Sequence, residues 1–580
     1  MFKAEIVKLL SKPTGLKNNE IEPLIEIPPS PDMGDYAFPC FVLSKKLKKA
    51  PNVIAQELAK EIKPKPPLSE IKAQGPYLNF FIDKNKLAEQ VIKEIIKCKV
   101  CYGSWPLKHK KVMVEYPAPN TNKPLHLGHV RNMLLGNSIC NILAFAGYQA
   151  IPVDLVNDRG VHICKSMLAY KKWGKGKEPN INRTGEVDSK GQRSFVKKPD
   201  HFLGDFYVLY NEKLKKHPEL EKETQEMLKK WEEDDKEVVA LWKKMREWAL
   251  KGFKQTYALF NVHHKKVYYE SEIYQQGKEI VLDGLKQGLF YKDEEGAVVA
   301  DLEKEGLGKK VLIRKDGTGL YITQDLYLAK LKFDDFKMDK SVYIVGNEQI
   351  YHFKVLFKIL GMLGFPFAEH CYHLAYGMVY LPEGRMKSRE GTVVDADDIV
   401  EEMKKVAEKE IKKRHKLDKK ELDKRKDIIG NGALKFFVLK YDPMKDITYN
   451  PEESISFEGE TGPYVQYAHA RISSILRKVK KFEPEKIKKY EFSHATEFML
   501  IKLLSDFPNI VNEAAENYKP SFVARYALEL AQAFNEFYHE CPVLKADGKT
   551  RDSRLALIYS VKIVLRNALD LLGIKAPEEM

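Results

Sequence analysis

The stretch KVMVEYPAPNTNKPLHLGHVRNMLLGNSICNILAFAGYQAIPVDLVNDRGVHICKSM, residues 111–167, decides the fold. It opens with a short apolar, β-rich run from Val112 to Tyr116, which prolines then interrupt at positions 117, 119 and 124. An almost uncharged helical pattern follows from Val130 to about Gly147. This order predicts a strand, a loop and a helix.

Two histidines stand where the predicted loop meets this helix. A helix N-terminus carries unpaired N–H groups and the positive end of the helix dipole, so it favours anions. His126 and His129, spaced as His-Leu-Gly-His, would lie on one side of a turn, and Gly128 would let a ligand approach the backbone. Imidazole N–H groups suit phosphate oxygens that gain charge in a transition state. Taken alone, the motif fits half-exposed loop histidines better, and zinc is disfavoured because no second ligand pair is near.

The composition limits the class of protein. A chain of 580 residues allows about three or four domains. Lys and Arg number 97 against 82 Asp and Glu, and this net charge of +15 indicates a polyanionic partner, either nucleic acid or a membrane surface. The longest uncharged run, Asn132 to Val153, contains polar residues, so we expect no transmembrane span; no signal peptide is apparent either.

The cysteines favour a reducing compartment, and we expect the cytoplasm. Seven cysteines are scattered along the chain. Cys98 and Cys101 form one CxxC pair without a second pair, so we expect neither a redox site nor a structural metal.

The first 90 or so residues indicate a separate α+β module. A strand pattern from Gly75 to Asp83 puts Tyr77, Asn79 and Phe81 on one face. This face fits either a half-buried sheet or an aromatic and amide surface that stacks on nucleic acid.

Alternating strand and helix patterns predict a parallel, doubly wound sheet of the Rossmann type. Further strand patterns cover residues 266–269, 297–302, 311–314 and 341–346, and charged helical patterns before them indicate an insertion. Ligands of such sheets bind beyond the carboxyl ends of the strands. The polar residues at or near those ends are Glu115, Asn120, Asp325 and Gln349.

A basic loop follows in the segment YGMVYLPEGRMKSREGTVV. It carries Arg385, Met386, Lys387, Ser388 and Arg389. Basic side chains in a glycine-bounded loop neutralise the charge that develops on a departing pyrophosphate. An ordinary basic surface loop is the alternative.

The set PNTNKPLHLGH, GTGLYITQDL, GRMKSREGTVV and GPYVQYAHARI resembles the class I aminoacyl-tRNA synthetases, and most closely the arginyl-tRNA synthetases. His126 to His129 resembles the family's HIGH signature, and the basic loop resembles KMSKS with its positive charge displaced by one residue. The resemblance implies an N-terminal α+β tRNA-binding domain at 1–100 and a Rossmann-type catalytic domain at 101–400 with a helical insertion at about 171–262. A helical anticodon-binding domain would occupy 401–580.

The resemblance also implies a reaction. Arginine and ATP, with Mg²⁺ as part of the substrate complex, would form arginyl-adenylate and pyrophosphate, and tRNA(Arg) would then receive the arginyl group. The family's requirement for tRNA in the first step is implied as well. We expect a monomer. The implied catalytic residues are His126, His129, Lys387 and Arg389.

Binding residues are implied in the same way. Two acids suit a guanidinium because carboxylates bind its planar fork bidentately. The arginine site would comprise Glu115, Asn120, Tyr321, Asp325 and Gln349. The ATP site would comprise His126, Gly128, His129, Gly377, Met378, Arg385, Met386, Lys387 and Ser388. The tRNA contacts would comprise Tyr77, Asn79, Tyr464, Gln466, Tyr538 and Met580.

Two other functions fit part of the pattern. A small adenylyltransferase shares the His-x-Gly-His chemistry but needs neither a C-terminal helical module nor an arginine pocket. A synthetase-like RNA-binding protein without catalysis would not need His126, His129, Asp325 and the basic loop, all of which are present. ATP–pyrophosphate exchange with each amino acid separates these alternatives.

Overall fold

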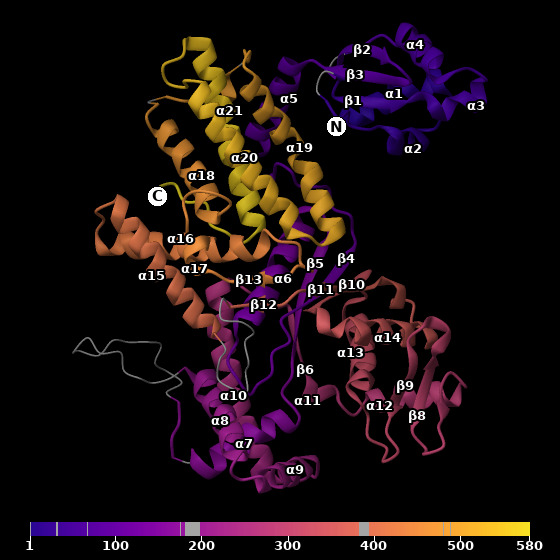
Figure 1. The fold of residues 1–580 in the computed structure, drawn as a ribbon, viewed down its shortest axis with the longest axis vertical. Helices are drawn as coiled ribbons and strands as arrows, with labels where there is room; N and C mark the ends of the chain where they lie inside the picture. Colours follow the sequence, from indigo (N-terminus) through magenta and orange to yellow (C-terminus); the bar gives the residue numbers. More distant parts are fainter. Residues whose placement is uncertain are drawn as a thin grey trace. The chain divides into compact units, whose positions relative to one another are not determined.

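The computed structural model describes residues 2–30, 33–65, 68–174, 176–179, 198–381, 394–479, 481–487 and 489–580 (Figure 1). They form two compact units. One unit consists of residues 1–102, 472–506 and 532–564, and the other consists of residues 103–471, 507–531 and 565–580.

The N-terminal part of the first unit is a small antiparallel sheet with helices. Its strands β1 (Tyr36–Pro39), β2 (Leu68–Gln74) and β3 (Tyr77–Ile82) lie in the order β1-β3-β2. Its helices are α1 (Phe2–Thr14), α2 (Asn18–Ile21), α3 (Ser44–Leu47) and α4 (Pro51–Glu61). Helix α5 (Lys84–Cys98) begins after Asp83, whose carboxylate accepts hydrogen bonds from the backbone N–H groups of Asn85 and Lys86.

The second unit contains the predicted parallel sheet, which confirms the Rossmann-type fold. Its strands are β4 (Lys111–Glu115), β5 (Gln149–Val156), β6 (Lys266–Tyr269), β10 (Lys340–Gly346) and β11 (Cys371–Tyr376). They pair in parallel in the order β11-β10-β4-β5-β6. Strand β4, which comes first in the chain among these five, is the central strand of the sheet. The strand order therefore reverses between β4 and β10, and sheets of this type bind their ligands at that point.

The predicted strand, loop and helix are present at the centre of this unit. After β4 the chain turns into α6 (Leu127–Phe145), which is apolar on most of its circumference and therefore buried. Gly136 lies against the fully buried ring of Tyr116, and a Cβ atom there would come within 2.2 Å of that ring. This glycine lets the helix pack closely on the residue that directly follows β4.

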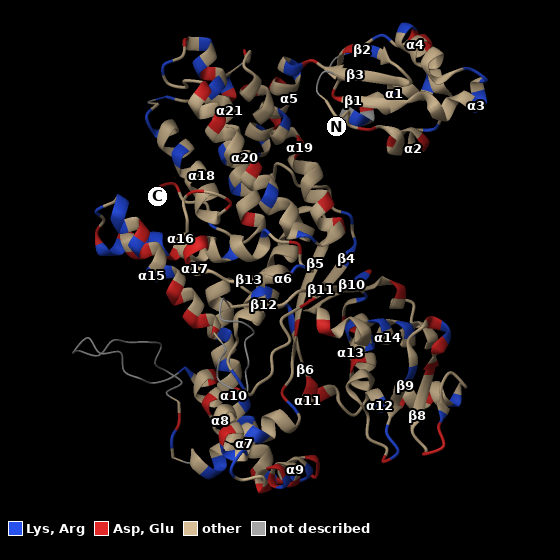
Figure 2. Cartoon of the chain, in the orientation of Figure 1, with Lys and Arg blue, Asp and Glu red and all other residues tan. Residues whose placement is uncertain are grey.

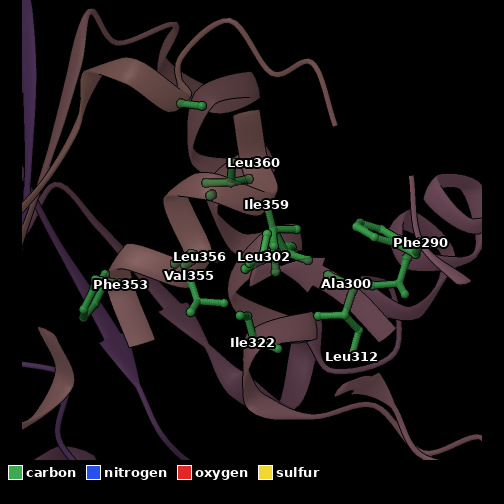
Figure 3. Packing of buried hydrophobic residues seen from close by; sticks show 14 of the residues in the cluster. Phe290, Ala300, Leu302, Leu312, Ile322, Phe353, Val355, Leu356, Ile359 and Leu360 are labelled. Carbon is green, nitrogen blue, oxygen red and sulfur yellow. The ribbon is translucent and has the colours of Figure 1, made fainter. Parts of the chain in front are cut away.

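Two of the predicted strands do not join the parallel sheet. The segments near 297–302 and 311–314 form β8 (Val298–Leu302) and β9 (Gly308–Ile313), which pair antiparallel with each other; β7 (Tyr291–Lys292) completes this second sheet. Helices α12 (Gly277–Lys286), α13 (Tyr321–Phe336) and α14 (Ile350–Met362) belong to the same region. Side chains from these elements form one apolar core, for example Phe290, Leu312, Ile322 and Leu356 (Figure 3).

Helices make up most of the rest of the chain. Helix α7 (Val161–Trp173) precedes the insertion, whose helices are α8 (Pro199–Leu214), α9 (Glu219–Glu232) and α10 (Lys236–Phe260). Helices α15 (Ala396–Arg414) and α16 (Lys419–Leu439) pack together, and Figure 2 shows both signs of charge along them. Helices α18 (Gly462–Arg477), α19 (Ala495–Asn517), α20 (Pro520–Glu540) and α21 (Gly548–Leu571) follow. No helix in the described ranges is both long and apolar enough to cross a membrane.

Candidate active site

A cavity of about 720 Å³ opens at the carboxyl ends of the parallel strands. It is lined by Glu115 of β4, Leu155 of β5, Gly346 of β10 and Tyr376 of β11. The cavity therefore lies at the edge of the sheet where the strand order predicted a ligand site.

The structure brings together every predicted arginine-site and ATP-site residue that it describes. Glu115, Asn120, Tyr321, Asp325 and Gln349 all line this cavity. His126, Gly128, His129, Gly377 and Met378 line it as well. The five predicted loop residues Arg385, Met386, Lys387, Ser388 and Arg389 lie outside the described residues.

The two histidines lie together at the start of α6. Their ring centroids are 4.0 Å apart. The N–H of Gly128 donates to Nδ1 of His126 over 3.2 Å, and the N–H of His126 donates to Nδ1 of His129 over 3.1 Å. Because Nδ1 accepts a hydrogen bond in both rings, each neutral imidazole carries its proton on Nε2. The loop thus presents two Nε2–H donors.

Both imidazoles are neutral at physiological pH. Burial, with the charge of Lys123 as a smaller cause, lowers the pKa of His126 to about 3. Burial also lowers the pKa of His129 well below its usual value, and His126 and Lys123 lower it further. The site can therefore donate hydrogen bonds to phosphate oxygens without a change of protonation state.

Each of the two predicted acids has a basic neighbour. The ammonium of Lys332, on α13, forms an ion pair with Oε2 of Glu115. Oδ2 of Asp325, also on α13, lies 2.7 Å from Nε2 of His352 on α14. Both acids are therefore held by contacts with other side chains of the protein.

The other predicted arginine-site residues are open to solvent. Tyr321, at the first turn of α13, is 69 % exposed. Asn120 follows β4 and Gln349 follows β10, and both are exposed on the wall of the cavity. Their side chains are accessible to a ligand that enters from outside.

A buried arginine fixes the segment that contains Gly377 and Met378. One guanidinium nitrogen of Arg131 donates to the carbonyl of Gly377 over 2.7 Å, and the other donates to the carbonyl of Lys445, also over 2.7 Å. The N–H of Met378 donates to Oδ1 of Asp446 over 2.7 Å. The backbone at this wall of the cavity is thus held in one position.

Sequence reasoning missed four charged or titratable residues near the predicted acids: Lys332, His352, Glu270 and Arg159. Burial raises the pKa of Glu270 to about 7, with the charges of Asp158 and Asp325 as further causes. Glu270 directly follows β6. Ligands bind at the carboxyl ends of parallel strands, and this rule, which pointed to Glu115 at the end of β4, also points to Glu270. Lys332 gives no such signal because it lies in the middle of a helix.

Two of the predicted tRNA contacts are buried in this structure and hydrogen-bonded within the protein. Asn79 is 3 % exposed, and its amide donates to Oε1 of Gln74 on the neighbouring strand β2. Gln466 is 0 % exposed, and its amide donates to the carbonyls of Lys575 and Ile428. Both side-chain amides therefore form hydrogen bonds inside the protein that stabilise its fold.

The remaining predicted tRNA contacts are at least partly accessible. Tyr77 is half-buried and packs edge-on against Phe41, with the ring centroids 5.8 Å apart. Tyr464 and Met580 are half-buried, and Tyr538 is 41 % exposed.

A charged cluster lies where α8 meets the start of α15. Asp200, His201 and Asp397 are close enough together to hold a metal ion. The ammonium of Lys198 lies 3.2 Å from Oδ2 of Asp200 and 2.7 Å from Oδ2 of Asp397, so a cation of this chain already balances these carboxylates. Nδ1 of His201 lies 3.3 Å from Oδ2 of Asp395.

This cluster gives the protein a pH-dependent stability. Burial alone would lower the pKa of His201, but the hydrogen bond to Asp397 and the charges of Asp200 and Asp395 outweigh it and raise that pKa. A histidine whose folded pKa lies above its unfolded value of about 6.5 contributes stability below that pH and loses it as the pH rises through the folded pKa. We expect His201→Gln to lower the free energy of unfolding at pH 6 by about 1.5–3 kcal/mol.

Thermal melts of both proteins from pH 6 to pH 9 test this expectation. The wild-type melting temperature should fall more steeply with pH than that of His201→Gln. Glu270 and Asp154, whose pKa values are raised to about 7, titrate in both proteins. Burial raises the pKa of Asp395 to about 6 and the charge of His201 lowers it, so the difference between the two curves reports on His201 together with the aspartates that it contacts. Parallel curves would exclude the histidine as the source.

The match to family models covers most of the chain. Residues 91–450 match the catalytic domain of class I (R) tRNA synthetases, residues 465–580 match the DALR anticodon binding domain, and residues 1–82 match the N-terminal domain of arginyl-tRNA synthetases. The chain belongs to the arginyl-tRNA synthetase family. The family resemblance seen in the sequence is confirmed.

Relatives of known name agree with this membership. An arginine–tRNA ligase of Treponema denticola is 45 % identical, over 96 % of this chain and 94 % of its own length, and one of Treponema pallidum is 42 % identical, over 100 % and 99 %. The solved arginyl-tRNA synthetase of Thermus thermophilus superposes with a TM-score of 0.81 at 28 % identity and full coverage of both chains. These relatives align with this synthetase over nearly the whole of the given sequence.

Proposed function

We propose that this synthetase ligates L-arginine to tRNA(Arg) in the cavity at the end of its parallel sheet. The observation that carries this proposal is the convergence of two neutral histidines and two supported acids, Glu115 and Asp325, on one cavity. Family membership supports the same reaction, with ATP as the source of energy.

The first step is the formation of arginyl-adenylate. An oxygen of the arginine carboxylate attacks the α-phosphorus of ATP, and the bond from that phosphorus to the bridging oxygen of the β-phosphate breaks, which releases pyrophosphate. The Nε2–H groups of His126 and His129 donate to phosphate oxygens as their charge grows. ATP enters as its Mg²⁺ complex, and Lys387 and Arg389 neutralise the departing pyrophosphate.

The ATP base and phosphates would contact the two glycine-bearing segments of the cavity. Gly128 lies at the N-terminus of α6, where N–H groups and the helix dipole favour an anion. Gly377 and Met378 form the wall that Arg131 fixes, and this rigid backbone suits a flat adenine ring.

The arginine side chain enters between the two acids. Glu115 and Asp325 accept hydrogen bonds from the guanidinium, with Tyr321 beside it, while Asn120 and Gln349 hold the α-amino and carboxylate groups. A lysine ammonium does not have the planar, forked arrangement of N–H groups that a guanidinium offers to two carboxylates. Bound lysine would therefore lose some of these hydrogen bonds, and each one lost costs about 1.5–3 kcal/mol of binding free energy.

The second step transfers the arginyl group to a terminal ribose hydroxyl of the tRNA, and AMP leaves. The accessible residues Tyr77, Tyr464, Tyr538 and Met580 are the contacts we propose for the tRNA. The protein acts in the cytoplasm as a monomer, and bound tRNA is needed for adenylate formation.

ATP–pyrophosphate exchange with each of the standard amino acids, run with and without tRNA(Arg), tests the proposal. We expect exchange with arginine alone, and only when tRNA is present. Exchange with leucine or cysteine but not arginine would refute the assigned substrate. Exchange with arginine in the absence of tRNA would refute only the tRNA requirement.

A further inference from the structure

Lys332 is a buried cation in contact with the proposed arginine site. It is 0 % exposed, and its ammonium forms an ion pair with Oε2 of Glu115, which is 5 % exposed. The same nitrogen lies 4.5 Å from the centroid of the Tyr343 ring on β10. Lys332 therefore spans from α13 to the carboxyl end of β4, while a neighbouring strand supports it from the side.

Neither charge of this ion pair is accessible to water, so solvent cannot stabilise either charge if the other is removed. A charge that is removed from water requires a partner of opposite sign in good geometry, and removal of one partner leaves the other uncompensated. Glu115 and Lys332 are therefore held to one another, and Oε1 is the carboxylate oxygen of Glu115 that remains for a ligand of the cavity. Lys332 itself is absent from the lining of the cavity, so it acts on a ligand only through Glu115.

We propose that Lys332 is a positioning and specificity residue, which fixes the carboxylate of Glu115 so that it matches a planar guanidinium rather than a lysine ammonium. This inference rests on the proposed function, in which Glu115 and Asp325 contact the substrate. An ammonium is nearly a point charge and tolerates many carboxylate orientations, whereas a guanidinium requires one. A carboxylate that is free to rotate loses affinity for arginine more than for lysine.

The charge balance of the pocket acts in the opposite direction, because removal of Lys332 leaves the cavity more negative and by itself favours any cation. With Lys332 present, Glu115 adds no net charge, and Asp325 can balance one guanidinium. Without Lys332, two carboxylates face a single guanidinium, and Glu115 lacks the contact that holds it in place. The expected loss of arginine affinity therefore comes from the position of the Glu115 carboxylate.

Pyrophosphate exchange on the full-length enzyme with saturating tRNA tests this inference. We expect Lys332→Met to raise the KM for arginine about 30-fold and to reduce the arginine-to-lysine discrimination about tenfold, while the KM for ATP changes less than threefold. Lys330→Met is the matched control. Lys330 lies partly exposed on the same helix and pairs with Asp334 over 2.6 Å, so its loss should leave all constants unchanged.

A double-mutant cycle separates positioning from packing. If Lys332 acts through Glu115, then Lys332→Met adds less than threefold to the KM for arginine in a Glu115→Gln background, and the double variant melts at a higher temperature than Lys332→Met alone. Fully additive effects on KM, or a double variant that melts no higher than Lys332→Met, would overturn the inference. A double variant that melts no higher than Lys332→Met overturns the inference even if Lys332→Met folds too poorly for kinetics.

The cycle also distinguishes a failure of the proposed role of Glu115 from a failure of the proposed role of Lys332. An unchanged KM for arginine in Glu115→Gln would overturn the assigned role of Glu115 and this inference with it. A raised KM in Glu115→Gln with an unchanged KM in Lys332→Met would overturn only the role of Lys332.

Discussion

Replacement of His129 by alanine is expected to slow adenylate formation by a factor on the order of 10²–10³. The variant loses one of the two Nε2–H donors that we propose for the phosphate oxygens, and water cannot supply a donor fixed in the same place. Because this interaction strengthens as charge develops, kcat should fall while the KM for arginine changes less than about threefold. Pyrophosphate exchange at saturating ATP, arginine and tRNA measures the effect.

The pH profile and a second histidine provide the controls. His263 is exposed in the same unit, so His263→Ala should keep wild-type exchange. Because burial lowers the pKa of His126 to about 3 and that of His129 well below its usual value, neither ring titrates between pH 6 and pH 8. Exchange that stays within tenfold of the wild type in His129→Ala would remove this histidine from the chemistry.

The part of the fold that was predictable from the sequence depends on local signals. The strand β4, the proline-rich loop and the buried helix α6 follow one another within a single stretch, and each has its own pattern of apolar residues and breakers. Polar residues after buried strands then indicated where ligands bind. Asn120 and Gln349 were found by that rule, and both line the cavity.

The contacts that sequence reasoning missed depend on which segments pair, and most of them join residues that are far apart in the chain. Residues 298–302 and 308–313 have strand patterns, but nothing in them says that they pair with each other instead of joining the parallel sheet. Lys332 has the sequence context of a solvated helix residue, and only the approach of β4 to α13 buries it against Glu115. The amide of Gln466 is buried for the same reason, since residues 428 and 575 come together around it.

Replacement of Asp325 by asparagine is expected to weaken the recognition of arginine. The substitution keeps the size of the side chain but replaces a charged acceptor with a neutral amide, one end of which is a donor. If Asp325 accepts two hydrogen bonds from the guanidinium, each worth about 1.5–3 kcal/mol, kcat/KM for arginine should fall by a factor on the order of 10²–10⁴. The KM for ATP should change little because we propose that other residues of the cavity bind ATP. Pyrophosphate exchange over a range of arginine concentrations measures both constants.

The same helix offers the matched control for this variant. Asp334 is exposed on α13 and pairs with Lys330 and Lys337, so Asp334→Asn makes the same chemical change without a neighbouring substrate. It should leave kcat/KM for arginine within twofold of the wild type. The hydrogen bond that Asp325 accepts from His352 complicates the comparison only if its loss distorts the cavity, and such distortion would also raise the KM for ATP. A KM for arginine in Asp325→Asn within threefold of the wild type would exclude Asp325 as a guanidinium ligand. Another acid on the cavity wall would then have to bind the guanidinium, and Glu270, which also lines the cavity, would be the next residue to substitute.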